Sequence, residues 1–452
     1  MVPQTSSLNF RVSTKPPELV VPATPTPREL KLLSDIDDQL CLRLQIPLVF
    51  FYGYRPSMAG KDPVQVIRQA LAKTLVFYYP FAGRLRESPN GKLMVDCNGE
   101  GVIFVEADAD VTIEQFGDNL LPPFPCFDKI LFNIPGSDGI IDSPILHLQV
   151  TRLKCGGFIF ALRFIHNMCD ASGIGQFLKA LAEIACGGPN PSILPVWHRE
   201  MLCARHPPRV TYTHDEYQEV PPDTRSMYEP KYCSFFFGPK EIASIRALLP
   251  HHVATKSTSF EVLTAWLWRS YTTALKLQNP DQEIHLLIPV NARFGHCRFN
   301  PPLPDGFYGN AMVLVSEVTT VGKLLSHPLG YALELVKKAK YKANEDYVRS
   351  VVDFVANKER ACFPRSGSFG VTDHTKAGFT DVNFGWGNAL YNGVVAKGGM
   401  GYMLGACAIT PHTNSNGEQG RAVLMSVPEY VLEMLEKEIG QHACTHMLMS
   451  NL

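Results

Sequence analysis

The run FIFALRFI at Phe158–Ile165 restricts the possible folds more than any other stretch of the chain. Its odd and its even positions are nearly all apolar, so a β-strand built from it has two apolar faces. Such a strand is stable only in the interior of a sheet that is covered on both sides. The run therefore predicts a layered α/β fold in which this segment is an interior strand.

Helical and strand patterns interleave irregularly along the rest of the chain, which favours mixed α/β sheets over a regular parallel fold. One helix is strongly signalled, because Asp62 is a good N-cap, Pro63 suits the first helical position, and apolar residues follow at helical spacing to Leu75. A second helix should follow Asp170, with Ser172 as its cap. Further helices are predicted at 240–248, 259–275, 329–340, 345–355 and 428–439. Further strands are predicted at 46–51, 93–95, 102–105, 145–150, 234–237, 285–290, 311–315, 368–371, 403–409 and 422–427.

The length of 452 residues exceeds what one hydrophobic core can organise and predicts two domains of roughly 200 residues each. The stretch from Pro189 to Lys231 is rich in Pro, His and Arg and has no repeating apolar spacing, which is typical of a connecting segment. We therefore predict an N-terminal domain at 1–190, a crossover at 191–231 and a C-terminal domain at 232–452.

His166 directly follows the apolar run, and Asp170 comes four residues later, at the start of a D-A-S-G-I-G turn. Strand ends are where sites form in α/β sheets, and a neutral imidazole can take a proton from an alcohol near pH 7. His166 is therefore a candidate general base. Spacing alone leaves alternatives open, because His166 could be a core histidine bonded to backbone, and Asp170 could either orient the ring or hold the loop.

The composition argues against several classes of function. The chain has 42 basic and 43 acidic residues, so it offers no overall field for nucleic acid or an anionic membrane. No apolar run approaches the roughly 20 residues of a membrane helix. The sequence contains neither an HExxH motif nor a Cys/His quartet with zinc spacing, and we predict no metal.

The cysteines and the chain ends bear on location. Twelve cysteines without a CxxC pair, together with the lack of a signal-peptide pattern, predict reduced thiols in the cytoplasm. The final residues Ser450, Asn451 and Leu452 match the peroxisomal address S-K-L at two of three positions. The peroxisome is therefore the alternative location.

Two short motifs give the chain a resemblance to a known family. H-N-M-C-D at 166–170 and N-F-G-W-G at 383–387 resemble the H-x-x-x-D and D-F-G-W-G signatures of the plant BAHD acyl-CoA-dependent acyltransferases. Supporting stretches in the family's order include LSDIDDQ (33–39), YYPFAGRL (78–85), STSFEVLTAWLWR (257–269), VNAR (290–293) and GFYGNA (306–311). The resemblance covers nearly the whole chain. Within the family, the chain is most similar to alcohol acyltransferases that form volatile esters, especially the benzyl alcohol O-benzoyltransferases.

The resemblance implies two domains that are each similar to chloramphenicol acetyltransferase, joined by a long crossover loop, with the active site in a channel between them. An acyl-CoA co-substrate and a small-molecule alcohol would both reach His166, which would act as the general base. Because transfer would be direct, no acyl-enzyme is needed and Cys169 is not expected to be a nucleophile. The resemblance implies no permanently bound cofactor, and we expect a monomer.

The resemblance also assigns roles to residues outside the first motif. Asp170 would point away from the channel and form a structural ion pair with Arg293. The second motif would be a structural turn in which an asparagine stands where the family has aspartate; its residues are Asn383, Phe384, Gly385, Trp386 and Gly387. By the same resemblance, Tyr308 and Asn310 would border the acyl pocket. Independently of it, Ser257 and Thr258 lie at a predicted helix start, where amide donors would meet the pantetheine or a phosphate of CoA, and ordinary N-capping is the alternative.

We therefore predict an acyl-CoA:alcohol O-acyltransferase. The preferred substrates are benzoyl-CoA and benzyl alcohol, and acetyl-CoA or other aliphatic acyl-CoAs are the alternative donors. A non-catalytic binding member of the family is the hypothesis from another class, and the intact His166 and Asp170 argue against it. A hydrolase that uses the same base on water is a third hypothesis.

Overall fold

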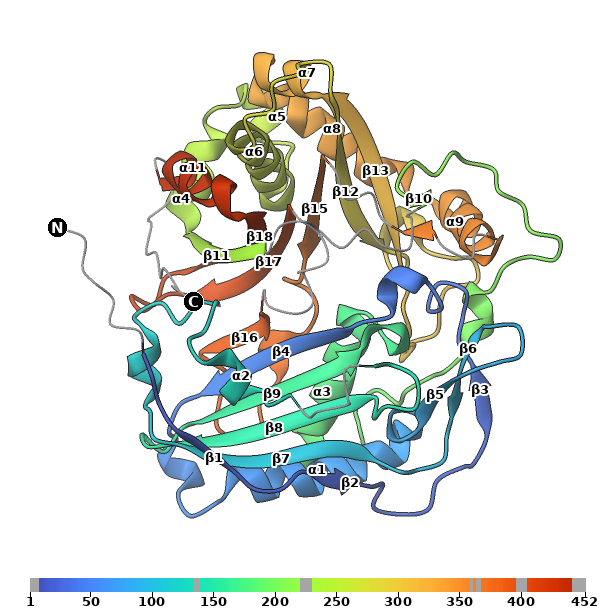
Figure 1. Ribbon diagram of the computed structural model, residues 1–452, viewed down its shortest axis with the longest axis vertical. Coiled ribbons are helices and arrows are strands. Elements are labelled where there is room, and N and C mark those ends of the chain that lie inside the picture. The colour runs from blue at the N-terminus through green and yellow to red at the C-terminus, as the bar shows by residue number, and fades with distance from the viewer. Residues whose placement is uncertain are drawn as a thin grey trace.

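The computed structural model describes residues 8–133, 139–219, 230–357, 361–362, 367–395 and 405–440. The described residues form two large mixed β-sheets, which lie one above the other in Figure 1 with helices packed against each. The prediction of a mixed α/β fold is therefore confirmed. Within these ranges, every helix is too short or too polar to cross a bilayer.

The first sheet has the strand order β1-β7-β8-β9-β4-β16, and β2 also pairs with β7. Strands β7 and β8 are parallel, whereas β8, β9, β4 and β16 pair antiparallel in succession. The strands are β1 (Val12–Thr14), β2 (Glu18–Val20), β4 (Gln45–Tyr52), β7 (Val102–Ala109), β8 (Leu146–Leu153), β9 (Phe158–Ile165) and β16 (Tyr391–Val394). Helices α1 (Pro63–Phe77) and α3 (Ala171–Ala185) pack side by side against this sheet, and α2 (Phe127–Ile130) precedes β8. A small sheet beside it contains β3 (Leu30–Leu32), β6 (Leu93–Asp96) and β5 (Arg84–Glu87).

The two strongest local predictions hold in the first half. Strand β9 lies between β8 and β4, and all of its residues are buried except the half-buried Arg163. Helix α1 begins at Pro63, and the Asp62 carboxylate accepts a hydrogen bond from the Val64 amide at 3.2 Å. Both features follow from local sequence, because apolar alternation and an N-cap followed by proline each specify one local conformation.

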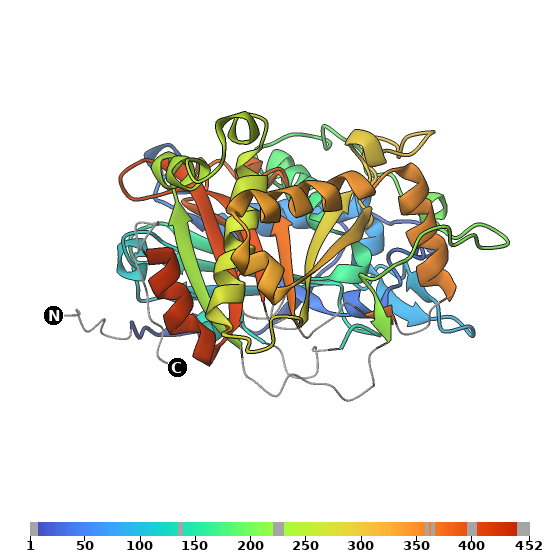
Figure 2. The same cartoon turned by 90° about the horizontal axis from the view of Figure 1, so that it is seen from above.

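The second sheet has the order β11-β18-β17-β15-β12-β13, with β15 parallel to both β12 and β17 and the other pairs antiparallel. Its strands are β11 (Pro230–Phe237), β12 (Glu283–Asn291), β13 (Met312–Thr320), β15 (Ser368–Asp373), β17 (Ala406–Thr413) and β18 (Gln419–Pro428). The helices of this half are α4 (Pro239–Arg246), α5 (His251–Ala254), α6 (Ser259–Ala274), α7 (Val321–Ser326), α8 (Leu329–Lys342), α9 (Glu345–Asn357) and α11 (Glu429–Gly440). Figure 2 shows α6 and α8 lying across the strands of this sheet.

One strand of the first sheet comes from the far end of the chain. The orange β16 lies beside the blue β4 in Figure 1, and Tyr391 pairs with Phe51. The sequence patterns did not predict β16, because it has only four residues and contains Asn392 and Gly393, which have low strand propensity. The strand predicted at 403–409 begins instead at Ala406, and residues 403–404 lie outside the described residues.

The described part of the crossover is firmly anchored although it lacks apolar periodicity. Arg205 forms an ion pair with the buried Asp353 of α9 at 2.7 Å, and His214 contacts Glu216 at 2.7 Å and Ser350 at 2.9 Å. Strand β10 (Gln218–Glu219) then pairs with β14 (Ala361–Cys362).

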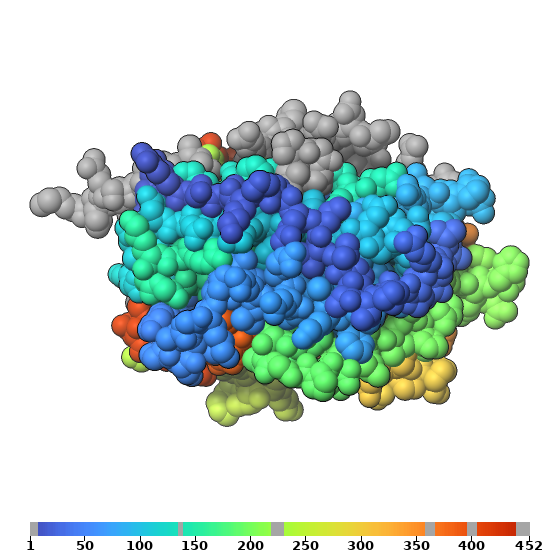
Figure 3. Space-filling view, turned by 90° about the horizontal axis from the view of Figure 1, so that it is seen from below, coloured from blue at the N-terminus to red at the C-terminus, as the bar shows by residue number. Residues whose placement is uncertain are grey.

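Seen from below, the first third of the chain covers most of the surface (Figure 3). The green segment that follows α3 runs along the border of this region. The domain boundaries at 190 and 232 stay predictions.

Candidate active site

His166 begins the short turn between β9 and α3. Its backbone amide donates to the Leu44 carbonyl at 2.9 Å, and its side chain is half-buried. The ring Nδ1 lies 3.1 Å from the Cys169 carbonyl oxygen. Because a carbonyl oxygen can only accept, Nδ1 must carry the proton, and Nε2 then bears the lone pair. His166 thus has the tautomer that a general base acting through Nε2 requires.

Burial lowers the pKa of His166 below its ordinary value of 6.5, although the Asp170 charge and the hydrogen bond to Cys169 act in the opposite direction. A buried imidazole is harder to protonate, because the charged form loses solvation. The ring is therefore neutral, and able to accept a proton, at neutral pH.

The Asp170 carboxylate is held by Arg293. Arg293 Nη1 lies 2.7 Å from Asp170 Oδ2 and Nη2 lies 3.2 Å from Oδ1, while the Ala311 amide donates to Oδ2 at 2.9 Å. Burial alone would raise the pKa of Asp170, but the Arg293 charge and these hydrogen bonds outweigh burial and lower it. The contact that the resemblance implied between Asp170 and Arg293 is present.

Asp170, and not Ser172, caps helix α3. The helix begins at Ala171, and Asp170 Oδ1 accepts a hydrogen bond from the Gly173 amide at 2.9 Å. The expected cap at Ser172 was therefore wrong, because Asp170 has the extended backbone of an N-cap and a side chain that reaches the free amide. The Ser172 hydroxyl instead accepts a hydrogen bond from Asn291 at 3.1 Å.

The residues expected beside the acyl pocket have buried structural contacts. Tyr308 packs its ring against Tyr78 and Phe81, with centroid distances of 5.2 and 5.5 Å. Asn310 is fully buried, and its Nδ2 donates to the carbonyl of His166 at 2.8 Å. Asn310 therefore holds the backbone of the candidate base. A substrate contact for Tyr308 or Asn310 stays a prediction.

The residues at the predicted helix start make local capping bonds. Thr258 Oγ1 accepts from the Glu261 amide at 3.2 Å, and Glu261 Oε2 accepts from the Thr258 amide at 2.9 Å, which forms a capping box for α6. The Ser257 hydroxyl donates to the Val253 carbonyl at 2.7 Å. Thr258 is thus an N-cap, as the alternative proposed. A contact of Ser257 or Thr258 with substrate stays a prediction.

The second motif forms a tight turn against the first sheet. Asn383 Oδ1 accepts hydrogen bonds from the amides of Gly385 and Gly387, both at 2.9 Å. The two glycines have positive φ angles of 105° and 88°, which L-residues with side chains rarely adopt. Trp386 packs edge-on against Phe158 and Phe384 against Phe160, both residues of β9. The motif therefore supports the strand that ends at His166.

This geometry explains how asparagine can stand in place of aspartate in the motif, because both contacts need only one acceptor oxygen. Asn383→Ala should lower the free energy of unfolding by roughly 1–3 kcal/mol, because two backbone amides lose their acceptor. Asn383→Asp should remain close to the wild type, and both can be measured by urea denaturation. Equal stability of the two variants would contradict this account of the turn.

Two residues that our sequence analysis did not single out support the His166 turn. Asp37 and Arg199 are fully buried and form an ion pair, with Arg199 Nη1 2.7 Å from both carboxylate oxygens of Asp37. Asp37 lies in the LSDIDDQ stretch that supported the family resemblance, and its carboxylate accepts a hydrogen bond from Ser34 Oγ at 2.6 Å. Nothing in the local sequence indicated that Arg199 of the crossover would reach this position.

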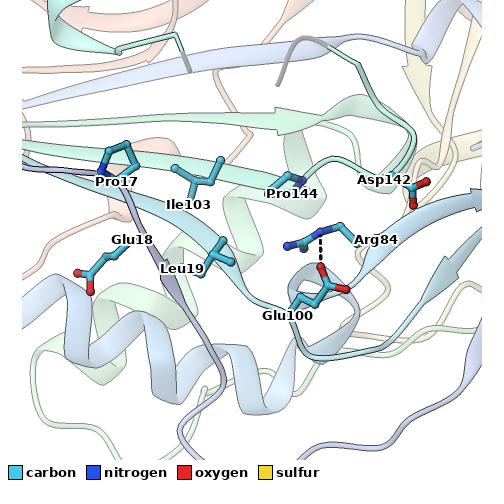
Figure 4. Close-up of a pocket in the computed structure, with 8 residues that line it drawn as sticks. All are labelled: Pro17, Glu18, Leu19, Arg84, Glu100, Ile103, Asp142 and Pro144. Atoms are coloured by element: carbon cyan, nitrogen blue, oxygen red, sulfur yellow. Dashed lines mark ion pairs between the residues drawn. The ribbon is translucent and has the colours of Figure 1, made fainter. Parts of the chain in front are cut away.

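A surface pocket lies away from His166 on the first sheet. Figure 4 shows it between β2, β5 and β7, with the Arg84–Glu100 ion pair of 3.1 Å on its wall. It contains neither residue of the H-x-x-x-D motif. Elsewhere in the described part of the chain, His, Cys, Asp and Glu side chains nowhere gather in threes that could hold a metal ion.

The model of the Transferase family matches residues 10–441. The chain belongs to this family. It is 58% identical over 442 residues to a 13-hydroxylupanine O-tigloyltransferase of Lupinus albus, covering 97% of this chain and 96% of that protein. It is 54% identical over 441 residues to a benzyl alcohol O-benzoyltransferase of Nicotiana tabacum, covering 96% and 94% of the two chains.

A solved structure shares the fold of this acyltransferase. The crystal structure of vinorine synthase superposes with a TM-score of 0.75 at 22% identity and covers 96% of this chain and 98% of that chain. At this identity the match establishes the fold alone. Together, the family match and the acyltransferase relatives confirm the resemblance to the BAHD family, and the chain is an acyltransferase.

Proposed function

We propose that this acyltransferase moves an acyl group from an acyl-CoA to the hydroxyl of a small alcohol, with His166 as the general base. The observation that carries the proposal is the contact of 3.1 Å between His166 Nδ1 and the Cys169 carbonyl, which leaves the lone pair on Nε2. A neutral histidine with a fixed ring and an available Nε2 is what deprotonation of an alcohol requires.

In this mechanism His166 Nε2 takes the alcohol proton as the alcohol oxygen attacks the thioester carbonyl. The tetrahedral oxyanion then collapses, the C–S bond breaks, and the proton passes from His166 to the CoA thiolate, which leaves as the free thiol. Burial raises the pKa of Cys169 well above its ordinary value, so this neighbouring thiol is a poor nucleophile. Its protonated state supports direct transfer without an acyl-enzyme.

Benzoyl-CoA and benzyl alcohol are the proposed substrates, and the relative from Nicotiana tabacum supports this choice. The relative from Lupinus albus favours a second candidate, in which a tigloyl group is transferred to the hydroxyl of a larger alcohol. Acetyl-CoA and other aliphatic donors are the third choice. Such choices depend on pocket shape, where one methylene changes discrimination by only about 1–3 kcal/mol.

A matrix of donors and acceptors tests the proposal. Purified protein is incubated with benzoyl-CoA, tigloyl-CoA or acetyl-CoA and with benzyl alcohol, a primary aliphatic alcohol or a cyclic secondary alcohol. Free thiol and ester are both measured. Equal amounts of thiol and ester are expected, and thiol without ester would indicate a hydrolase. Neither product with any pair, despite binding of acyl-CoA by calorimetry, would indicate a non-catalytic binding protein.

The pH dependence of ester formation follows from the environment of His166. The reaction needs neutral imidazole, and burial lowers the pKa of His166 below 6.5. Activity should therefore be full at neutral pH, persist below pH 6.5 and fall only as the pH drops through the lowered pKa. The measurement is kcat/KM for a saturable alcohol across the acid range, and a midpoint above 6.5 would contradict the assignment.

A further inference from the structure

The peptide carbonyls of His166, Asn167 and Met168 are held by two side-chain donors from distant parts of the chain. Asn310 Nδ2 donates to the carbonyls of His166 at 2.8 Å and of Asn167 at 3.3 Å. Arg199 Nη2 donates to the Met168 carbonyl at 2.8 Å. The fourth carbonyl, that of Cys169, accepts from the His166 ring. The direction of this last carbonyl, and with it the ring orientation, depends on how the three preceding peptides are held.

Asp37 joins these donors into one buried unit. Its carboxylate accepts from Arg199 Nη1 at 2.7 Å and from Asn310 Nδ2 at 2.8 Å, and its main-chain carbonyl accepts from Asn167 Nδ2 at 2.6 Å. Asp37, Arg199 and Asn310 are at most 1% exposed. We call these three residues the loop clamp, because they connect the N-terminal segment, the crossover and the second half of the chain to the His166 turn.

The environment of Arg199 suits a guanidinium group. Its guanidinium carbon lies 4.4 Å from the ring centroid of Trp197 and 5.1 Å from that of Tyr308, so two aromatic rings contact the charged group. A Cβ at Gly309 would lie 2.2 Å from Arg199 Nη1, so only glycine allows the backbone this close. A planar fork is needed to reach Asp37 with one nitrogen and the Met168 carbonyl with the other.

We propose that Arg199 is a positioning residue for the catalytic base, which fixes the His166 ring by holding the Met168 peptide and the Asp37–Asn310 pair. This inference rests on the proposed function of His166. It differs from the role of Asp170 and Arg293, because that ion pair holds the start of α3, whereas the loop clamp holds the turn before it. The crossover is thus part of the active-site support and not only a connection.

The proposal has a consequence that a purely structural role lacks. The hydrogen bond from Nδ1–H to the Cys169 carbonyl stabilises the protonated ring, so loosening it should lower the pKa of His166 further. It should also misplace Nε2 relative to the alcohol, and a displacement of about 1 Å can cost roughly 100-fold in rate. Arg199→Lys should therefore lower kcat roughly 10- to 100-fold with little change in KM, and should move the acid limb of kcat/KM to lower pH.

The crossover provides a control arginine. Arg205 also forms an ion pair of 2.7 Å with a buried aspartate, Asp353, but it has no contact with the His166 turn among those that the described residues make. Arg205→Lys should reduce stability less than Arg199→Lys, because the Arg205 side chain is 36% exposed and that of Arg199 is 1% exposed, and it should leave kcat and the pH profile unchanged. Asn310→Ala is the second variant, because it removes the donor to the His166 and Asn167 carbonyls and keeps the Asp37–Arg199 pair.

The readouts separate this inference from the proposed function. The ring pKa of His166 is measured by NMR on protein with ¹³Cε1-labelled histidine, and the His166 signal is assigned by its loss in His166→Gln. This measurement does not depend on catalytic turnover. A lower ring pKa in Arg199→Lys or Asn310→Ala, but not in Arg205→Lys, is expected. If the wild type forms no ester while this pattern appears, the proposed function fails and the positioning role stands. Folded Arg199→Lys or Asn310→Ala proteins with wild-type ring pKa and kcat, or the same changes in Arg205→Lys, would overturn the inference.

Discussion

Replacing His166 with alanine is expected to lower kcat for ester formation by about 10²- to 10⁴-fold, the range that a positioned general base contributes. The variant removes the imidazole whose Nδ1 is held by the Cys169 carbonyl, and with it the acceptor for the alcohol proton. The folded state should persist, because the backbone of His166 keeps its hydrogen bonds to Leu44 and Asn310. The measurement is kcat with the best donor and acceptor, together with thermal unfolding.

A surface histidine serves as the control for this experiment. The His198 side chain is 57% exposed and contacts Glu200 at 2.9 Å, so His198→Ala should keep wild-type kcat. A His166→Ala protein that unfolds at the wild-type temperature and still forms ester at a rate near that of the wild type would sink the proposed mechanism.

The second large effect is expected in stability. Asp170→Asn should lower the free energy of unfolding by about 3–5 kcal/mol, because it leaves Arg293 without its charged partner where both side chains are at most 10% exposed. The lowered pKa of Asp170 agrees with this expectation, because it means that the ionised carboxylate stabilises the folded state. Its stabilisation is complete above the pKa of the unfolded chain and is lost as the pH falls through the lower pKa of the folded state.

Asp62→Asn is the matched control for Asp170→Asn. Both aspartates cap a helix of 15 residues and both pair with an arginine, but the Asp62–Arg152 side chains are 25% and 29% exposed. Asparagine preserves a cap, so Asp62→Asn should cost at most about 1 kcal/mol in urea denaturation. Similar losses in the two variants would show that burial of the pair is not the cause. Combining Asp170→Asn with Arg293→Met should cost less than the sum of the single changes, because no charge is then left unpaired.

The sequence was most informative where a signal was local. The apolar alternation of Phe158–Ile165 identified an interior strand, Asp62 and Pro63 identified the start of α1, and the H-x-x-x-D motif placed His166 at a strand end. Ser172 was the wrong cap for α3, because Asp170 and Ser172 both have suitable side chains and only the backbone conformation decides between them. Strand β16 had no local signal, because two of its four residues have low strand propensity. It forms because it pairs with β4.

The roles of charged residues depended on contacts across the chain. Asp170 and Arg293 are 123 residues apart, and Arg199 and Asp37 are 162 apart. The family resemblance suggested the first pair, but no local pattern indicated the second. A short stretch of sequence does not show that a charged residue will be buried, because burial depends on a partner that is distant in the chain.

By itself, the sequence determined the fold class, the family and the histidine that lies at the end of β9, because each depends on short patterns of side-chain chemistry. Only the tertiary structure decided which nitrogen of that histidine bears the lone pair and what holds the ring in place. The reason is physical: the Cys169 carbonyl selects the tautomer, and its direction is set by donors on Arg199 and Asn310 that reach the turn only when both halves of the chain have folded together.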